Sequence, residues 1–325
     1  MTGVPVALSV VLPMFNEQAN VGQLFDRLLP ALDLLGLNYE VICVDDGSAD
    51  TTLSLLREVN RQHAQVKIVA LSRNFGKDTA LSAGLAAARG QAVLSLDADL
   101  QHPLEMIPEF IARWREGYEI IYAYRASRAD ESFAKRQLSR AYYGLISRIS
   151  DPVIPPHTSD FRLLDRKVVD VVNAMPERAR FVKGLSIWPG FRQIGVAYQP
   201  HARAGGTTSW NLWKLWNFAL DGLTAFSTLP LRIWTYVGLV VSAFAFVVGS
   251  YELGRVLLFG IELPGYASII TSVLFLGGLQ LIATGILGEY LARIFTEVKG
   301  RPLFVVRERI GFDTDTAEPQ VRRPA

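Results

Sequence analysis

Two long stretches without a charged side chain place the tightest constraint on the fold of this chain. Ile233–Tyr251 and Tyr266–Gly288 contain no Asp, Glu, Lys or Arg over 19 and 23 residues. A bilayer's hydrocarbon core is roughly 30 Å thick and a helix rises about 1.5 Å per residue, so each stretch can cross a membrane. A buried core helix is the alternative, but two such runs in tandem disfavour it. The sequence predicts a two-helix transmembrane hairpin within residues 229–292, with spans at about 233–253 and 266–288.

Basic residues around the predicted hairpin indicate its orientation. The connection 252–265 holds a single basic residue, Arg255, whereas several stand beyond each outer end. Because basic residues concentrate on the cytoplasmic side of membrane helices, we expect both chain termini in the cytoplasm and the hairpin in the cytoplasmic (inner) membrane. Residues 293–325 are then a cytoplasmic segment with a disordered tail from about residue 313. The flanking basic residues are Arg203, Lys214, Arg232, Arg293, Lys299, Arg301, Arg307 and Arg309.

The rest of the chain has the composition of a water-soluble protein. The whole chain has 325 residues, of which 33 are Lys or Arg and 31 are Asp or Glu, and this balance gives no basic footprint for a nucleic acid. The single cysteine, Cys43, excludes a disulfide framework and a cysteine-based zinc cluster. We therefore expect a soluble domain at residues 1–210.

Strand and helix patterns alternate in the first part of that domain. This order predicts an α/β fold, a mostly parallel sheet with helices on both faces, and ligands bind such sheets beyond the carboxyl ends of the strands. The predicted strands are Ala7–Pro13, Glu40–Val44, Val66–Ser72 and Ala92–Leu96. The predicted helices are Ala19–Leu35, Thr51–Gln62 and Thr79–Ala88.

A further helix is expected between the soluble domain and the hairpin. Residues 211–228 are rich in Trp, Leu and Phe and carry few charges, which predicts an amphipathic interfacial helix with its Trp side chains at headgroup level. A helix packed on the soluble domain remains an open alternative.

Carboxylate and amide side chains follow three of the predicted strands. Asn16 and Glu17 follow the first strand, Asp45 and Asp46 the second, and Asp97 and Asp99 the fourth. Any one of these groups alone is adequately explained as turn chemistry. Three of them at one edge of a parallel sheet favour a convergent acidic site.

Asp97-Ala98-Asp99 is the part of this set best suited to a metal ion. Carboxylates are hard oxygen ligands that favour Mg2+ or Mn2+, and the side chain of Gln101 offers a further oxygen. His102 is interpreted as a local turn contact, not as a ligand. Taken alone, the two aspartates are equally consistent with an ordinary acidic turn.

Several common catalytic signatures are absent. The chain has no GxxxxGK[ST], no GxGxxG after a strand, no GxSxG and no HExxH. Kinases, dehydrogenases, serine hydrolases and zinc hydrolases all lose support.

The ordered motifs resemble those of family-2 glycosyltransferases, and more narrowly the polyisoprenyl-phosphate glycosyltransferases. This group includes bactoprenol glucosyltransferases and dolichol-phosphate mannose synthases. The resemblance implies a GT-A fold and transfer of a sugar from UDP or GDP to a lipid phosphate at the cytoplasmic membrane face. It extends from about Ala7 to Val306 and is carried by VVLPMFNE, VDDGSADTT, LSRNFGKDTALSAGL, LDADLQHP, TSDFRLLDR and GEYLARIFTEVKGRP.

The resemblance also implies roles for individual residues. The nucleotide sugar would be bound by Pro13, Asn16, Glu17, Asp46, Lys77 and Asp97. The divalent cation would be bound by Asp97, Asp99 and Gln101. The lipid phosphate would be bound by Arg125, Lys135, Arg136, Ser139 and Arg162. The catalytic residues would be Asp160, Asp99 and Arg203.

Two of these assignments keep alternatives open. Asp160 either orients the sugar or the basic groups around it, or acts as a base. Lys135 and Arg136 are equally explained as a solvated helix face or as an attraction to anionic lipid headgroups. The loop that begins at Arg203 also departs from relatives, because Thr208 is followed by Ser209-Trp210 and the usual lysine is absent.

The expected activity is an inverting, metal-dependent transfer of glucose from UDP-glucose to undecaprenyl phosphate, a polyprenyl phosphate. Three alternatives remain: a mannose synthase that uses GDP-mannose, a processive polysaccharide synthase, and a non-catalytic membrane scaffold. The last two are disfavoured, because the chain lacks a QxxRW-like motif and keeps both acidic motifs. The resemblance further implies a homo-oligomer, a tetramer.

Overall fold

The computed structural model describes residues 5–125, 158–175, 177–178, 180–198, 229–259 and 265–312. The chain divides into two compact units. One holds the sheet and the helices around it, and the other holds two long helices within Trp210–Gly300. The predictions for Lys135, Arg136, Ser139, Arg203, the interfacial helix at 211–228 and the tail from 313 lie outside the described residues.

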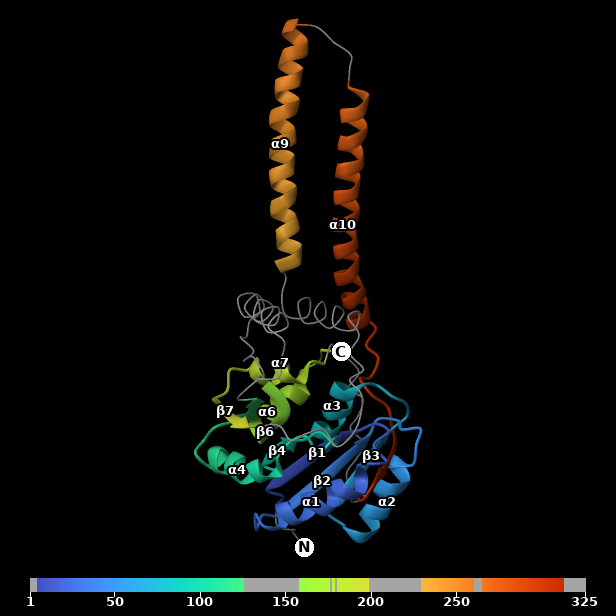
Figure 1. Ribbon diagram of the computed structural model, residues 1–325, viewed down its shortest axis with the longest axis vertical. Coiled ribbons are helices and arrows are strands. Elements are labelled where there is room, and N and C mark those ends of the chain that lie inside the picture. The colour runs from blue at the N-terminus through green and yellow to red at the C-terminus, as the bar shows by residue number, and fades with distance from the viewer. Residues whose placement is uncertain are drawn as a thin grey trace. The chain divides into compact units, whose positions relative to one another are not determined.

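An eight-stranded sheet forms the centre of the first unit, in the order β7-β5-β6-β4-β1-β2-β3-β8 (Figure 1). Four of the neighbouring pairs are parallel, β1–β2, β1–β4, β2–β3 and β5–β7, and three are antiparallel. The mostly parallel α/β sheet predicted from the sequence is therefore confirmed. The strands are β1 (Leu8–Met14), β2 (Tyr39–Asp45), β3 (Val66–Leu71), β4 (Ala92–Ser95), β5 (Ile120–Arg125), β6 (Thr158–Asp165), β7 (Gln193–Tyr198) and β8 (Val306–Ile310).

Helices cover both faces of this sheet because its central strands are apolar on both sides. Along β1, Val10 and Leu12 pack into one core cluster, with helices α1, α2 and α4, while Val11 packs into the other, with α3, α6 and α7. This alternation follows from the two-residue period of a strand. The helices are α1 (Val21–Asp33), α2 (Thr52–Gln62), α3 (Lys77–Ala87), the 3-10 turn η1 (Leu104–Met106), α4 (Ile107–Arg115), α6 (Arg166–Ala174) and α7 (Val182–Ile187).

The four early strands and three early helices match their predicted positions to within a few residues. Helix α3 begins two residues earlier than expected, at Lys77. Lys77 is therefore in the first turn of the helix, directly after Gly76, whose φ of 97° suits a residue without a side chain.

The last described strand, β8, was not predicted. The sequence predicted only a cytoplasmic segment at residues 293–325, but Val306–Ile310 pairs antiparallel with the edge strand β3. Arg57 of α2 forms an ion pair with Glu308 at 2.5 Å, and Ser72 N donates to Val305 O. The segment after residue 300, expected to lie outside the soluble domain, therefore completes its sheet.

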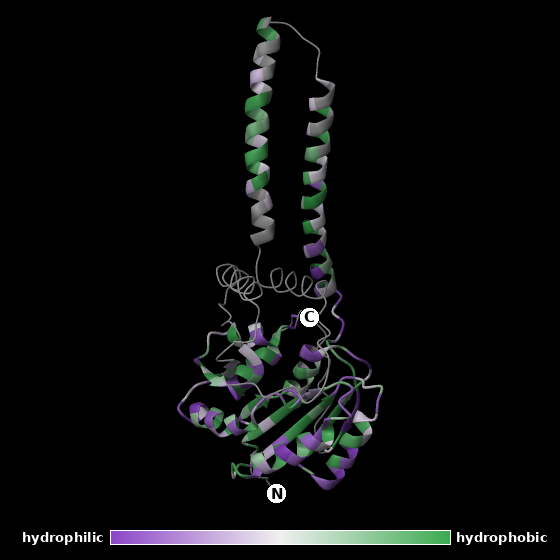
Figure 2. Ribbon diagram, viewed as in Figure 1, coloured by the Kyte–Doolittle hydropathy of each residue, from purple (hydrophilic) through white to green (hydrophobic). Residues whose placement is uncertain are grey.

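The second unit contains two continuous helices, α9 (Leu229–Phe259) and α10 (Tyr266–Val298). Figure 2 shows hydrophobic residues along both. Among the described residues, one helical stretch, Phe275–Val298, is long and apolar enough to cross a membrane, and the apolar stretch Tyr236–Val248 in α9 is shorter.

Candidate active site

The candidate site lies where several strands end at one edge of the sheet. β1, β2 and β4 run parallel, so the residues that follow Met14, Asp45 and Ser95 meet there. β6 runs antiparallel to β4, with Ser95 opposite Arg162, and therefore brings its first residues to the same edge. Asp160 enters the site from this antiparallel strand.

The loop after β1 is held in place by the loop after β2. Asn16 N donates to Ser48 Oγ at 3.0 Å, and Asn16 Oδ1 accepts from Ala49 N at 2.9 Å. Asn16 has a φ of 56°, which Asn tolerates better than most residues. Pro13 is half-buried within β1, directly before this loop.

Glu17 lies near enough to Asp97 and Asp99 for their charges to act on its carboxyl group. Burial raises the pKa of its carboxyl, Asn20 Nδ2 donates to it and lowers the pKa, and the charges of Asp99 and Asp97 raise it. These repulsions indicate that the carboxylates after β1 and β4 converge, as the sequence predicted.

Asp46 holds the loop that leads into α3. The residue is 3% exposed, and its carboxylate accepts from Phe75 N at 2.7 Å and from Gly76 N at 2.9 Å. Burial raises its pKa, and these two hydrogen bonds oppose the rise. A Cβ on Gly47 would lie 2.5 Å from Arg73 C, so the two loops approach too closely for any other residue. Asp46 thereby fixes the start of α3 and hence Lys77.

Asp97, Asp99 and His102 form a cluster that suits a divalent cation. Each offers one ligand atom, and these atoms lie within 4.8 Å of one another. Nearby, His102 Nδ1 is buried and has no hydrogen-bond partner in the described part of the chain. A buried ring nitrogen without a partner is costly unless something completes it, and together with the two carboxylates it fits Mg2+ or Mn2+.

His102 differs from its interpretation as a local turn contact. Its Nε2 lies 2.6 Å from Ser159 Oγ on β6, and its ring lies 5.2 Å from that of Phe161. Burial lowers the pKa of the imidazole, so it is neutral at physiological pH. A neutral imidazole with one nitrogen hydrogen-bonded and the other unpartnered is the form that binds a metal.

Leu100, between Asp99 and Gln101, has a φ of 59°. Asn16 and Leu100 are the two described residues other than glycine with positive φ, and both lie in loops of this site. A side chain in this conformation is strained, and such strain concentrates where loop geometry serves a site.

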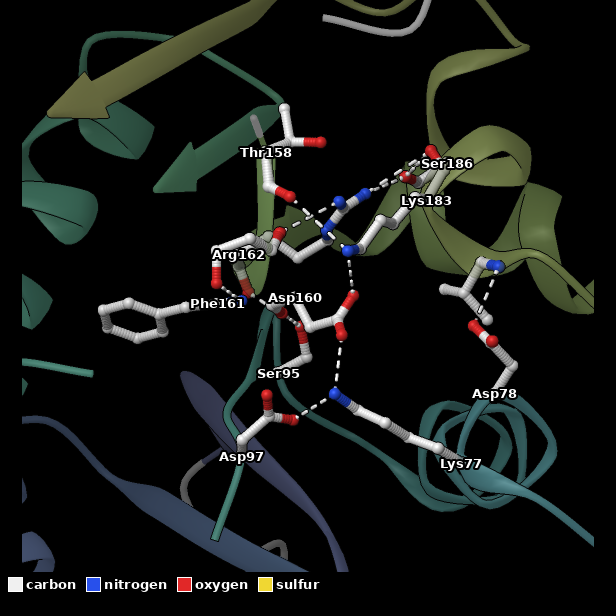
Figure 3. A network of polar contacts seen from close by, with 12 residues as sticks. Lys77, Asp78, Ser95, Asp97, Thr158, Asp160, Phe161, Arg162, Lys183 and Ser186 are labelled. Atoms are coloured by element: carbon white, nitrogen blue, oxygen red, sulfur yellow. Dashed lines mark hydrogen bonds and ion pairs between the residues drawn. The ribbon is translucent and has the colours of Figure 1, made fainter. Parts of the chain in front are cut away.

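Four charged residues form an ion-pair chain across the site, in the order Lys183, Asp160, Lys77 and Asp97 (Figure 3). Lys77 Nζ lies 2.6 Å from Asp97 Oδ1 and 2.6 Å from Asp160 Oδ2, and Lys183 Nζ lies 3.0 Å from Asp160 Oδ1. The chain joins the loop after β4, the start of α3, the start of β6 and the first turn of α7.

The ion-pair chain sets the protonation of its members. Burial alone would raise the pKa of Asp160, but the ammonium groups of Lys183 and Lys77 outweigh it and hold the pKa well below its usual range. Burial would lower the pKa of Lys77, yet Asp97 and Asp160 raise it above its usual range. Asp160 is therefore a carboxylate and Lys77 an ammonium at neutral pH.

Arg162 is placed differently from its predicted role as a ligand of the lipid phosphate. Its side chain is 1% exposed, and its guanidinium donates to Ser186 Oγ at 2.7 Å and to Ser159 O at 3.1 Å. A further contact, at 3.4 Å, joins it to Lys183 O. These bonds tie β6 to α7, and a residue used in this way is a structural residue, not one that faces a substrate.

Two charged residues at the site were missed by the sequence reasoning. Asp78 accepts from Val182 N at 3.3 Å, and burial together with the charge of Asp160 raises its pKa. Lys183 completes the ion-pair chain. Neither belongs to a strand-end motif, since one follows Lys77 inside α3 and the other is in the short helix α7, so spacing gave no signal for them.

The other predicted site residues are only partly placed. Arg125 ends β5, opposite Tyr198 of β7, and the orientation of its side chain is not among the described features. The structure brings Lys77, Asp97, Asp99 and Asp160 together, with Gln101 in the same loop as the two aspartates. Their binding and catalytic roles stay predictions.

Comparison with known proteins decides the family. Residues 9–172 match the model of glycosyl transferase family 2. The chain belongs to this family. Within it, the chain is 49% identical to an uncharacterized glycosyltransferase of Synechocystis sp., over 95% of this chain and 97% of that protein. It is 40% identical to a prophage bactoprenol glucosyl transferase homolog of Escherichia coli, over 92% of this chain and 98% of that protein.

A bactoprenol glucosyl transferase of Shigella phage SfV is likewise 40% identical, over 92% of this chain and 98% of that protein. Among solved structures, mannosyl-3-phosphoglycerate synthase from Rubrobacter xylanophilus aligns with a TM-score of 0.48 and 18% identity, over 80% of this chain and 78% of that chain. The GT-A-like α/β fold is the one expected for a family-2 glycosyltransferase. The chain is thus an enzyme of the hexosyltransferase type.

Proposed function

We propose that this enzyme transfers glucose from UDP-glucose to a polyprenyl phosphate, undecaprenyl phosphate, at the cytoplasmic face of the membrane. The observation that carries the proposal is the ion-pair chain, in which Lys77 joins Asp97 of the proposed cation site to Asp160. The names of the relatives at 40% identity support bactoprenol as the class of acceptor and glucose as the sugar.

Asp97, Asp99 and His102, with Gln101 beside them, would hold a divalent cation. Bound Mg2+ or Mn2+ would supply positive charge that stabilises the leaving nucleoside diphosphate. Lys77 binds one oxygen of Asp97 and leaves the second oxygen for a cation. Its ammonium thus lies beside the proposed diphosphate site and adds to the stabilisation of the leaving group.

The acceptor needs little help from a base, because a lipid phosphate is already an anion. Its oxygen would attack the anomeric carbon in line with the leaving diphosphate, which inverts the configuration there. Asp160 is held ionised by two lysines, so its role in this geometry is to orient those cations and the sugar. Catalysis then consists mainly of positioning and charge stabilisation.

The two long helices support attachment to a membrane. We propose that α9 and α10 both span the cytoplasmic membrane, with both chain termini in the cytoplasm and the interfacial segment at residues 211–228 between domain and hairpin. The long apolar stretch Phe275–Val298 supports the second span most directly. A homotetramer is the proposed assembly, and the mass of the detergent-solubilised protein tests it.

The decisive experiment follows label from the nucleotide sugar into an organic-extractable lipid. Purified full-length protein with undecaprenyl phosphate, Mn2+ and labelled UDP-glucose should give a labelled lipid, and EDTA should stop it. Parallel assays with UDP-galactose, UDP-GlcNAc and GDP-mannose test the sugar and the nucleotide. Preference for GDP-mannose would assign the enzyme as a mannose synthase, and the absence of labelled lipid with every donor would contradict the proposal.

A further inference from the structure

The ion-pair chain contains one cation whose charge is incompletely neutralised. Lys77 is shared between two carboxylates, each at 2.6 Å. Arg162 is fully buried, and its guanidinium is used by hydrogen bonds within the protein. Lys183 has one carboxylate oxygen at 3.0 Å and a weaker contact with Thr158 O at 3.4 Å.

Lys183 can also reach a ligand. Its side chain is 26% exposed, and an ammonium has three N–H donors, of which the described contacts use two. Figure 3 shows it on the side of Asp160 away from Lys77. The two lysines therefore mark two sides of one carboxylate, with Lys77 on the side of the acidic cluster.

Arg162 holds the backbone of Lys183 in place. Arg162 donates to Lys183 O and to Ser186 Oγ, both in α7, and to Ser159 O in β6. Asp160 then holds the ammonium at the other end of the side chain. A long flexible side chain fixed at both ends loses little further entropy when it binds a ligand, so this lysine is pre-organised.

The reaction proposed above must bring two anions together, the donor diphosphate and the acceptor phosphate. The donor side has Lys77 and the acidic cluster for a cation, and Asp97 belongs to that cluster. A second cation is needed for the acceptor, since like charges at close range repel strongly in a partly buried site. The two ammonium groups and two carboxylates of the ion-pair chain balance overall, but Asp97 ends the chain at the proposed cation site, so Lys183 is its positive end and can attract an anion there.

We infer that Lys183 binds the phosphate group of the lipid acceptor, with Asp160 orienting the ammonium. This inference rests on the proposed function and adds a residue to it. The resemblance to relatives had given such a role to Arg162, but that side chain is buried, two positions after Asp160 in β6. Lys183 takes its place, because its ammonium is partly exposed beside the same aspartate.

The test measures binding of two lipids that differ only in the phosphate. Full-length protein in detergent is titrated with undecaprenyl phosphate and with undecaprenol, and the ratio of the two dissociation constants gives the contribution of the phosphate. A charge-assisted hydrogen bond contributes on the order of tenfold in affinity, so Lys183→Met should lower this ratio by about that factor. Lys183→Arg keeps the charge and should retain part of the ratio.

Lys167 offers a matched control. It lies on α6 of the same unit and its side chain is exposed, so Lys167→Met removes a lysine that takes no part in the ion-pair chain. The ratio should be unchanged in this variant. A second titration, with UDP and Mn2+, measures the donor side, and the dissociation constant of UDP should change less than about twofold in Lys183→Met.

The outcomes separate the inference from the function on which it rests. If the wild type forms the labelled lipid but Lys183→Met keeps the full phosphate ratio, only the inference is overturned. An affinity loss for UDP as large as that for the lipid phosphate would place Lys183 on the donor and also overturn it. If the wild type forms no lipid-linked sugar, the proposed function fails and the inference fails with it. Thermal melting shows whether each variant is folded, and Lys183→Gln, which also removes the charge, replaces Lys183→Met if the latter is not.

Discussion

The two halves of the candidate site reach the same sheet edge by different routes. The donor half, with Asp97, Asp99 and Lys77, is built from loops after parallel strands. The other half, with Asp160 and Lys183, is built from the start of an antiparallel strand and a short helix. Residues after parallel strands converge by topology alone, whereas the second half depends on how β6 pairs with β4. The first half can be predicted from the order of strands in the sequence, whereas the second can be predicted only when the antiparallel pairing of β6 with β4 is known.

The largest expected effect is in the donor half. Asp99→Ala removes a carboxylate of the proposed metal cluster and should lower transfer by about a thousandfold or more, because positioning and charge stabilisation carry the reaction. The measurement is labelled lipid formed per minute, with the thermal midpoint as the folding control. Asp26→Asn, at an exposed aspartate on α1, should retain full activity. Wild-type turnover of Asp99→Ala in the presence of EDTA would contradict the metal assignment.

The second largest effect is expected on the free energy of unfolding, in the half of the site that holds Asp160 and Lys183. Arg162→Met removes a buried guanidinium that joins β6 to α7, and should cost about 3 kcal/mol of unfolding free energy. Arg113→Met, which removes the exposed ion pairs of Arg113 with Glu109 and Glu116, should cost much less, because solvent screens exposed ion pairs. Thermal melting in detergent compares the two. Equal losses would show that Arg162 does not hold the second half together.

The two aspartates near Lys183 should differ in their effect on the pH dependence of stability. The pKa of Asp160 is lowered in the folded state, so its stabilisation is present above the unfolded pKa near 3.8 and is lost as pH falls through the folded pKa. Asp160→Asn should therefore be destabilised at pH 7.

The pKa of Asp78 is raised, so its contribution is favourable below the unfolded pKa near 3.8 and is lost as pH rises through the folded pKa. Asp78→Asn should lose no stability at pH 7, and its stability relative to wild type should increase as the solution is made less acidic. Melting curves from about pH 2 to about pH 8 measure both variants, because the contribution of Asp160 changes below about pH 4 and that of Asp78 above it. The same sign of pH dependence for the two would contradict the opposite pKa directions.

The smallest effect is expected away from both halves, at the sheet edge. Glu308→Gln removes the ion pair with Arg57, in which both side chains are more than a third exposed. Exposed ion pairs contribute up to about 1 kcal/mol, so the thermal midpoint should fall slightly and transfer activity should be unchanged. A large loss of activity would show that β8 acts on the site through Ser72 and the loop that follows it.

The difference between the halves also explains what the sequence could predict. Asp97 and Asp99 were found because they follow a recognisable strand, and the expectation that they converge with Glu17 is supported by the pKa of Glu17. Asp160 entered only through the resemblance to relatives. Lys183 was missed, because its proximity to Asp160 depends on how α7 packs on β6.

Lys183 was missed, whereas Arg162 was assigned a binding role that its burial does not support. An arginine two residues after a site aspartate looks like a ligand for phosphate, but its hydrogen bonds to α7 and to the start of β6 bury it. Strand β8 was missed for a related reason. Its five residues alternate between half-buried and exposed, and its place is determined by the free edge of β3, not by a hydrophobic run of its own.

The pairing of β8 with β3 has a consequence for biosynthesis. Proteins emerge from the ribosome amino-terminal end first, and strands β1 to β7 are complete before α9 and α10 are made. The edge of β3 therefore stays unpaired until the residues after α10 have been synthesised. The sheet can reach its final eight strands only after both long helices have been translated, so β8 pairs with β3 as a last step of assembly.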